Sequence, residues 1–223
     1  MGEMEIRREL PEDFAKTEAM TREAFWNQYC PGCVEHYLVY LLRSCPAFLP
    51  ELDFVALVDG EVVGNVMGVK GVIQCDCGTR QEVVTVGPLS VAPEWQRQGI
   101  GAKLLACLKR DAGEMGFPAL LLCGDSAYYQ KQGFLPAESF GIRTEEDEYA
   151  AALQACELFE GALQDSAGRY CENPAYFVRE SDAMEFDRQF PEKERRSDTP
   201  GQRRFQEVVK MRRKAGDILY NQP

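Results

Sequence analysis

The segment Gln96-Arg97-Gln98-Gly99-Ile100-Gly101 places two glycines where a predicted strand passes into a predicted helix. A turn of this kind directs several main-chain N–H groups outward at the positive end of the helix dipole. An anion bound there gains hydrogen bonds and charge stabilisation together, and glycine lets it approach the main chain. The segment therefore predicts a phosphate-binding turn.

Two well-known phosphate loops do not fit this segment. A Walker loop requires Gly-x-x-x-x-Gly-Lys-Ser/Thr, whereas Gly99, Gly101 and Lys103 are spaced differently and no hydroxyl residue follows. A dinucleotide-binding fingerprint requires a third glycine, but that position is Leu104. The turn must belong to another class of phosphate site.

The elements that position the turn follow from the hydrophobic pattern. Residues 53–92 contain three β-branched runs. Asp59-Gly60 separates the first two and the turn at 75–79 precedes the third, which predicts an antiparallel meander. Gly87-Pro88 interrupts the last run and predicts a bulge or a parting of neighbouring strands. The apolar run at 118–123 indicates a buried strand parallel to its neighbour. Between the meander and the run at 118–123, apolar residues recur with the helical period of 3.6. They predict a helix with one buried face, made of Ile100, Leu104, Leu105, Leu108, Ala112 and Met115.

With these elements in place, the chain resembles the GCN5-related N-acetyltransferase (GNAT) family. LSVAPEWQRQGIGAKLL, residues 89–105, is similar to the family's pyrophosphate-binding motif, and YYQKQGF, residues 128–134, to its following aromatic helix. The resemblance implies a mixed α+β fold whose mostly antiparallel sheet is splayed between its fourth and fifth strands, with helices on both faces. We expect residues 1–178 to form this domain, and residues 179–223 to form a charged C-terminal extension with a helix at 200–214.

In this family acetyl-CoA lies where the fourth strand parts from the fifth. The resemblance implies that the main chain of Leu89 and Val91 pairs with the pantetheine. It implies further that the pyrophosphate is held by the turn and the first helical residues, namely Gln96, Arg97, Gln98, Gly99, Ile100, Gly101 and Ala102. Arg97 either adds charge to this site or is an ordinary surface arginine.

The implied reaction is direct attack by a primary amine, of a small molecule or of a peptide or protein, on the thioester. Tyr129, four residues before Gly133, matches the family's tyrosine that protonates the departing thiolate. A phenol suits that task, because its pKa of about 10 is close to that of an alkyl thiol. The alternative role for Tyr129 is packing, which we expect of its neighbour Tyr128.

The general base is where the chain departs from the family pattern. Many relatives use a glutamate midway along the fourth strand, but Val83–Val86 carry no carboxylate. Glu82, at the start of that strand, is the remaining acidic candidate, and a water chain or a weakly basic amine is the alternative. A CoA-binding sensor without catalytic activity is therefore the alternative function.

The composition limits the partners. The 223 residues carry a formal net charge of −11, which argues against a nucleic-acid partner, because phosphate binding needs a clustered positive surface. The apolar runs are too short to cross a bilayer and the N-terminus lacks a secretory signal, so we expect a cytoplasmic protein without membrane contact. The helix expected at 200–214 would dock on the body of the chain or on a second copy, which leaves a homodimer open.

Nine cysteines are spread along the chain, and without a secretory signal we expect reduced thiols. Cys30 and Cys33, with His36 and the pair Cys75 and Cys77, suggest a zinc cluster as an alternative, because thiolate and imidazole are the usual ligands of zinc. The spacing before His36 is not a standard one. We therefore expect no metal site.

Overall fold

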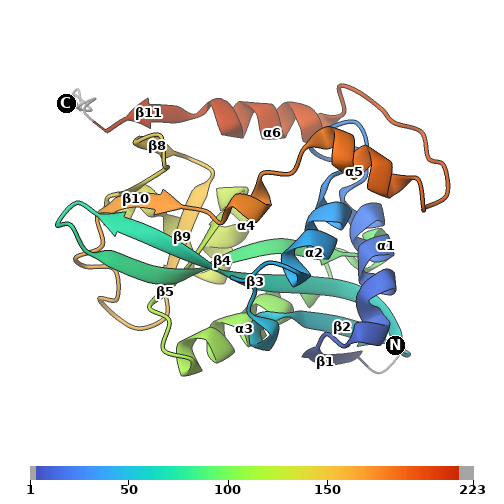
Figure 1. Cartoon of the computed structure of the whole chain (residues 1–223), viewed down its shortest axis with the longest axis horizontal. Coiled ribbons are helices and arrows are strands. Elements are labelled where there is room, and N and C mark those ends of the chain that lie inside the picture. The colour runs from blue at the N-terminus through green and yellow to red at the C-terminus, as the bar shows by residue number, and fades with distance from the viewer. Residues whose placement is uncertain (1–3, 216–223) are drawn as a thin grey trace.

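The structure is a computed structural model that describes residues 4–215 (Figure 1). Within these residues nine strands form the main sheet, and they are β1 (Met4–Arg8), β2 (Phe54–Val58), β3 (Glu61–Cys75), β4 (Arg80–Val91), β5 (Ala119–Cys123), β6 (Leu135–Pro136), β7 (Ile142–Arg143), β9 (Leu153–Glu157) and β10 (Gly168–Cys171). The strand order is β1-β2-β3-β4-β5-β9-β6, and β10 pairs with β3 and β7. The β4–β5 and β7–β10 pairs are parallel, whereas the others among the described strands are antiparallel.

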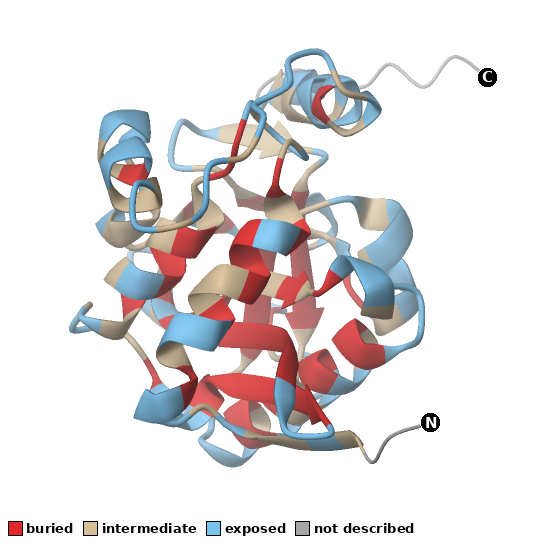
Figure 2. Cartoon of the chain, turned by 90° about the vertical axis from the view of Figure 1, so that its right-hand side faces the viewer, coloured by how far each residue is buried: buried red, intermediate tan, exposed pale blue. Residues whose placement is uncertain are grey.

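Helices cover both faces of this sheet. They are α1 (Phe14–Phe25), α2 (Glu35–Arg43), α3 (Ile100–Glu114), α4 (Ser126–Tyr129), α5 (Glu180–Asp187) and α6 (Pro200–Lys210). The alternation of side chains along β2 defines the two faces, because Phe54, Ala56 and Val58 pack in the cluster of α3, and Val55 and Leu57 pack in that of α1. In Figure 2 the buried residues follow the sheet and the inner faces of these helices. None of the helices within residues 4–215 has the length and apolar character of a membrane span.

The predicted meander is confirmed. Strands β2, β3 and β4 pair antiparallel in chain order, and the β2–β3 turn has positive φ at Asp59 (50°) and Gly60 (81°), as a type I′ turn requires. Met67 of β3 lies opposite both Gly87 and Pro88, since Val66 faces Leu89 and Gly68 faces Val86. The predicted irregularity is therefore a bulge in β4.

The predicted parting of the fourth and fifth strands is also confirmed. Strand β5 pairs with β4 only through Val84–Leu120 and Thr85–Leu121. Beyond Thr85, β4 continues along β3 to Val91, while the chain after β5 turns away into α4. The β5 side of β4 is consequently open over its last six residues, 86–91.

The C-terminal extension is tied to the body by a buried ion pair. Arg22 of α1, with a side chain 4% exposed, donates from Nε to Asp187 of α5 at 2.6 Å and also donates to the carbonyl of Pro191. His36 of α2 lies 3.3 Å from the same carboxylate. Although burial by itself raises it, the pKa of Asp187 is lowered by the hydrogen bond and charge of Arg22.

The helix predicted at 200–214 begins at Pro200 as expected but ends at Lys210. Thr199 caps it, with its Oγ1 accepting from the N–H of Gln202. The prediction was wrong for the last residues, which form the strand β11 (Arg212–Lys214) and pair with β8 (Glu148–Ala150). The reason is tertiary, since the open edge of β8 offers main-chain partners that an isolated helix end does not have.

Replacing Asp187 with Ala should lower the free energy of unfolding by about 3 kcal/mol, because it leaves the buried guanidinium of Arg22 without its carboxylate. Urea unfolding checks this. The control is Asp182→Ala on the same helix, where the ion pair with Arg179 is exposed and is expected to contribute less than about 1 kcal/mol. Equal losses in the two variants would contradict this view of the attachment.

His36 should make the protein less stable in mild acid. Burial lowers the pKa of His36 to about 4, despite the opposing charge of Asp187, whereas the pKa in the unfolded chain is about 6.5. The unfolded state therefore binds the extra proton first, and the free energy of unfolding falls as the pH drops from about 6.5 through about 4. Between pH 7 and pH 5, His36→Gln should lose about 2 kcal/mol less than the unchanged protein. Identical pH slopes in urea unfolding would show that His36 does not titrate in this way.

Candidate functional site

The glycine turn has the conformation of an anion-binding site. After β4 the chain makes a short 3₁₀ turn (Pro93–Trp95), and Arg97 (φ 61°) and Gly99 (φ 84°) then adopt left-handed conformations before α3 begins at Ile100. When left-handed residues alternate with residues of negative φ, successive N–H groups point to one side of the chain. The first N–H groups of α3 have no partner within the helix, so they face the same side as free donors.

The two glutamines of the turn brace it from within. Gln96 donates from its side chain to the carbonyl of Val91 at 3.1 Å, and Gln98 donates to that of Glu94 at 3.0 Å. Their side chains are therefore engaged with the main chain behind the turn. The N–H of Gln96 donates to the carbonyl of Pro93, so any contact of the two with an anion falls to the N–H of Gln98. The Arg97 side chain is exposed.

The open segment of β4 lies against this turn. A Cβ placed on Gly101 would lie 3.6 Å from Val91 and 3.9 Å from Leu89, so these two residues lie beside the start of α3. The same Cβ would lie 2.7 Å from the hydroxyl oxygen of Tyr128. The structure thus brings together Leu89, Val91 and the residues from Gly99 to Ala102, as the sequence predicted.

The surroundings of Tyr128 and Tyr129 are the reverse of those expected from the sequence. Tyr128 is 39% exposed with its hydroxyl above Gly101, whereas Tyr129 packs on the α3 side of the core, with its ring 5.6 Å from that of Phe134. A Cβ on Gly124, the residue after β5, would collide with the Tyr129 ring, so a glycine is needed there. The prediction that Tyr128 is the packing residue was wrong, because Gly124 leaves room for the ring of Tyr129.

Tyr129 nevertheless reaches the place where β4 and β5 part. Burial raises the pKa of Tyr129, and the neighbouring Tyr29, Tyr128 and Cys123 raise it further. Tyr29 and Cys123 both line a cavity at the end of β5. The Tyr129 phenol is therefore protonated at neutral pH, and its ring lies against Gly124, a residue that lines this cavity.

Glu82 is not part of this arrangement. It lies at the first end of β4, opposite Val72, with a side chain 64% exposed and 3.5 Å from Lys70. Seven residues of extended strand separate it from Leu89, a distance of roughly 23 Å.

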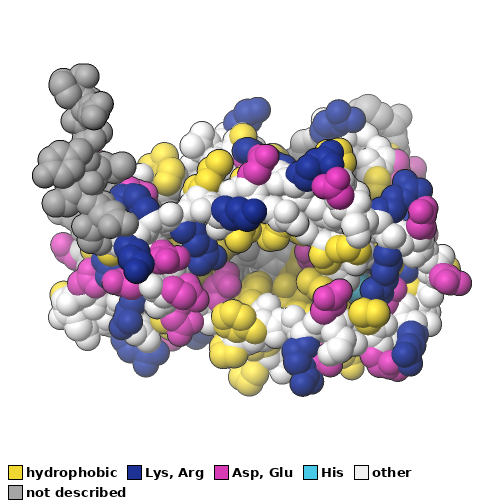
Figure 3. All heavy atoms as spheres, turned by 90° about the horizontal axis from the view of Figure 1, so that it is seen from above, with side chains coloured by type: hydrophobic (Ala, Val, Ile, Leu, Met, Phe, Trp, Pro, Cys, Tyr) yellow, Lys and Arg dark blue, Asp and Glu magenta, His cyan; other side chains and the backbone are white. Residues whose placement is uncertain are grey.

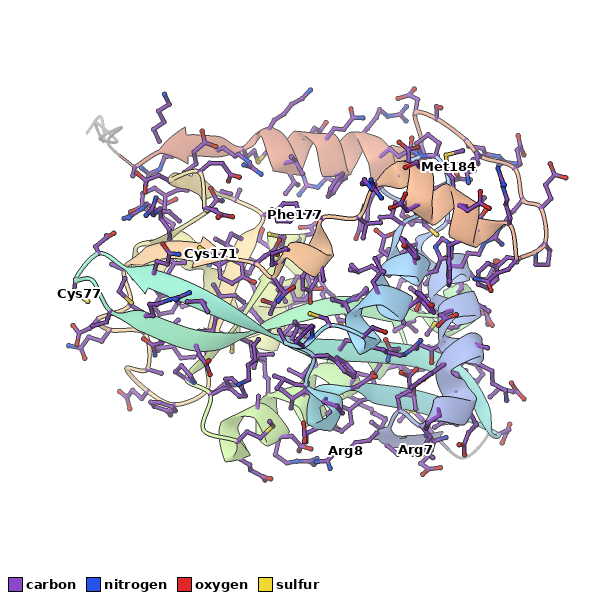
Figure 4. The ribbon with its side chains drawn as sticks, viewed as in Figure 1. Arg7, Arg8, Cys77, Cys171, Phe177 and Met184 are labelled. Carbon is purple, nitrogen blue, oxygen red and sulfur yellow. The ribbon has the colours of Figure 1, made fainter. Side chains whose placement is uncertain are left out.

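The cysteines and His36 do not gather at one place. Cys33 lies with its Sγ 3.3 Å from Nδ1 of His36, whereas Cys77 lies at the exposed β3–β4 turn, at the far end of the sheet in Figure 4. Within residues 4–215 no group of three or more His, Cys, Asp or Glu side chains is arranged to hold a metal ion. Burial raises the pKa of Cys33, which keeps it a thiol.

The cavity at the end of β5 was not predicted from the sequence. It measures about 490 Å³ and lies between α6 and the segment Cys123–Asp125. Figure 3 shows the hollow from the side of α6, with hydrophobic side chains around it, and in Figure 4 Phe177 lies beneath α6. The sequence contained only a weak indication of this cavity, because the apolar stripe of α6 indicated that the helix docks on a surface and not that it covers a space.

Two tyrosines that the sequence did not single out attach the end of β10 to the open part of β4. The Tyr170 hydroxyl is 2.6 Å from Oγ1 of Thr85, and the Tyr176 hydroxyl donates to the carbonyl of Gly87 at 2.9 Å. Both are within GRYCENPAY, residues 168–176, where a tyrosine recurs after six residues. That spacing has no meaning until the fold places Thr85 and Gly87 beneath it.

Comparisons with known proteins agree with this geometry. The family model "Acetyltransferase (GNAT) domain" matches residues 51–136. The "Uncharacterized N-acetyltransferase YhbS" of Escherichia coli (strain K12) is 30% identical over 166 residues, which are 74% of this chain and 93% of the relative.

Two solved structures are similar as well. The crystal structure of the GNAT family N-acetyltransferase YhbS from Escherichia coli in complex with CoA has a TM-score of 0.70 and 28% identity, covering 79% of this chain and 93% of that one. A GNAT family acetyltransferase from Brucella melitensis in complex with acetyl-CoA has a TM-score of 0.59 and 28% identity, covering 79% and 99%.

Gly101→Val should weaken the binding of inorganic pyrophosphate to the turn at least tenfold, because the added side chain covers the N–H groups at the start of α3. Isothermal calorimetry measures the change. Gly113→Ala is the matched control in the same helix, since the nearest atom to its added Cβ is 4.0 Å away. Unaltered pyrophosphate affinity in Gly101→Val would mean that the anion binds elsewhere.

Proposed function

The chain belongs to the GNAT acetyltransferase family, and from this premise we propose that it transfers the acetyl group of acetyl-CoA to a primary amine by direct attack in a ternary complex. The acceptor belongs to a small molecule or to a peptide or protein. The observation that carries this proposal is the open side of β4, which begins where β4 and β5 part and ends beside the glycine turn at the start of α3.

The residues present suit the binding of acetyl-CoA. The N–H groups from Arg97 to Ala102 suit a pyrophosphate, because they combine free donors with the positive end of the α3 dipole, whereas the N–H of Gln96 donates to the carbonyl of Pro93. The open side of β4 at Leu89 and Val91 offers main-chain groups to a pantetheine amide, as an added strand would use them, although the Val91 carbonyl already accepts from the side chain of Gln96. When bound, acetyl-CoA supplies the acetyl thioester.

Tyr129 is the proposed acid. Its raised pKa keeps the phenol protonated until a thiolate is present to accept its proton. The surrounding apolar groups, the Phe134 ring among them, exclude water and so strengthen the interaction of the phenol with a developing charge.

The position of Glu82 argues against its proposed role as general base, since it lies at the opposite end of β4 from Leu89. Its carboxylate is exposed and paired with Lys70, so it is engaged away from an amine at the thioester. Either another residue or solvent must accept the proton, and a CoA-binding module without catalytic activity is the alternative if none does.

Three other expectations from the sequence stay predictions. They are the cytoplasmic location, the absence of nucleic-acid and membrane partners, and the homodimer. The boundary at residue 178 also stays a prediction, although α5, α6 and β11 pack against the body of the chain.

Tyr129→Phe should lower kcat for thiol release from acetyl-CoA at least 100-fold with a panel of primary amines, because the thiolate then leaves without its proton donor. The Kd for acetyl-CoA should change less than threefold, since the ring is retained. Tyr37→Phe, in the half-buried aromatic cluster of α2 and α5, serves as the control. A normal rate in Tyr129→Phe would remove the acid role, and tight CoA binding without turnover in the unchanged protein would favour the inactive module.

A further inference from the structure

The apolar face of α6 forms the roof of a cavity and does not enter the core. Phe205, Val208 and Val209 line the cavity from above, and Phe205 is 41% exposed. Gln202 is the buried residue of this helix, and its side chain donates to the carbonyls of Asn27 and Arg196. The helix is thus fixed by its cap at one end and by the β11–β8 pair at the other, and its middle spans a space.

The body of the chain provides the apolar walls below. Tyr29, Ala150 and Ala152 line the cavity opposite α6, and the rings of Tyr29 and Phe205 are 4.7 Å apart. Arg204 of the roof lies 3.5 Å from Asp125, so that charge is balanced locally. A volume of about 490 Å³ with such walls is typical of a site for a small, largely apolar molecule.

An acidic recess adjoins this cavity. It measures about 140 Å³, shares Cys123, Thr144 and Arg212 with the cavity, and contains the carboxyl groups of Glu145, Glu146 and Glu172. Arg212 lies 3.8 Å from Glu146 and 3.6 Å from Glu148. Among the described residues, Glu172 has neither an ion pair nor a side-chain hydrogen bond, although it is half-buried.

Glu172 is held above the parting of β4 and β5. It lies between Tyr170, bound to Thr85 of the last β4–β5 pair, and Tyr176, bound to Gly87. Burial raises the pKa of Cys123, at the end of β5, to about 12, and the charge of Glu172 contributes to that rise. Glu172 is therefore close to the end of β5 and to the middle of β4, where the two strands part.

We propose that the cavity under α6 is the acceptor site, that it selects a small primary amine with an apolar body, and that Glu172 takes the first proton from this amine. The apolar body would lie against Phe205 and Val208, and the charged nitrogen would point into the acidic recess. This inference rests on the proposed acetyl transfer.

The protons and electrons balance as follows. The ammonium gives one proton to the Glu172 carboxylate, which passes it to water. The lone pair of the neutral nitrogen then forms the N–C bond, and the electrons of the breaking C–S bond leave on sulfur. Tyr129 protonates that thiolate and recovers the second proton of the nitrogen, so that the products are the amide, the free thiol and one proton in water.

The groups that face Glu172 allow a pH test. They are Glu145 and Glu146 from the loop before β8, Arg212 from β11, Cys123 from β5, and Tyr170 and Tyr176 on either side. Burial and then the charge of Glu146 raise the pKa of Glu172, so the carboxylate is lost at a higher pH than in an ordinary glutamate. A base must be ionised, and kcat/KM should therefore fall as the pH drops through this raised pKa.

The first experiment compares Glu172→Gln with Glu185→Gln, a control that removes a carboxylate from the exposed pair with Arg188. With 2-phenylethylamine as acceptor, Glu172→Gln should lower kcat/KM about 100-fold and remove its acid limb, with Kd for CoA unchanged. Calorimetry of 2-phenylethylamine against the protein without CoA should show at least tenfold weaker binding in Glu172→Gln. A retained acid limb, or unchanged amine binding, would overturn the role of Glu172.

The second experiment tests the roof of the cavity. Val208→Glu places a charge in the cavity, whereas Gln206→Glu adds the same charge to α6 outside it. Val208→Glu should raise KM for 2-phenylethylamine at least tenfold and leave KM for acetyl-CoA unchanged, and Gln206→Glu should change neither. Equal effects of the two variants would overturn the assignment of the cavity.

The choice of amine separates this inference from the proposed function. In the unchanged protein, kcat/KM should be at least tenfold higher for 2-phenylethylamine than for 2-aminoethanol or spermidine, because the cavity walls are apolar. Turnover that favours spermidine or a lysine peptide would overturn the apolar acceptor and leave the acetyl transfer intact. Failure to bind acetyl-CoA at all would instead overturn the proposed function.

Discussion

The hydrogen bonding between β4 and β5 stops after Thr85–Leu121, and the site depends on this interruption. A main-chain N–H or C=O within a sheet needs a partner, because burial without one is costly. The bulge at Gly87–Pro88 lies where β4 continues along β3 and β5 diverges. Within the described part of the chain, residues 86–91 therefore have no strand partner on one side, and only the carbonyls of Gly87 and Val91 are taken by side chains. A ligand with amide groups of its own can complete that edge, and this links the architecture of the sheet to the chemistry of the family.

Side chains from distant parts of the chain keep the gap from closing. Tyr129 packs where Gly124 leaves space, immediately after β5, and so directs the chain away from β4. On the other side Tyr170 and Tyr176 hold Thr85 and the carbonyl of Gly87 by their hydroxyls. The two hydroxyls also serve as hydrogen-bond partners of the Thr85 side chain and of the Gly87 carbonyl. The same contacts therefore contribute to the stability of the fold and to the shape of the open edge.

The C-terminal extension is attached by polar interactions as well as by the packing of Phe186 and Phe190 against α2. Arg22 and Asp187 form a largely buried pair, Arg22 also lies 4.2 Å above the Trp26 ring, and the cap of α6 binds the carbonyl of Asn27. Such contacts fix orientation strictly, because a charged pair loses most of its stabilising effect when its geometry changes. They hold α6 at a set height above β5 and leave its apolar face uncovered. Figure 2 shows the consequence, since α6 stands apart from the buried core.

Much of the fold and the cofactor side of the site could be predicted from the sequence, because both depend on local patterns. The alternation at 53–92, the turn at Asp59-Gly60, the period of α3 and the glycines at 99 and 101 each act within a few residues of chain. The acceptor side could not be predicted in this way. Contacts between distant segments decided that Tyr129 is packed and Tyr128 exposed. They also decided the exposed position of Glu82 and the strand at Arg212–Lys214.

By itself, then, the sequence determined the strands of the meander, the helix α3 and where a diphosphate can meet free N–H groups, since hydrophobic periodicity and helix ends are local properties. Only the tertiary structure decided that Glu172 lies above the end of β5 and that α6 covers a cavity there. The physical reason is that these placements depend on three contacts between segments far apart in the sequence, which are Tyr170 with Thr85, Asp187 with Arg22, and β11 with β8. No repeating pattern within one segment records such a contact.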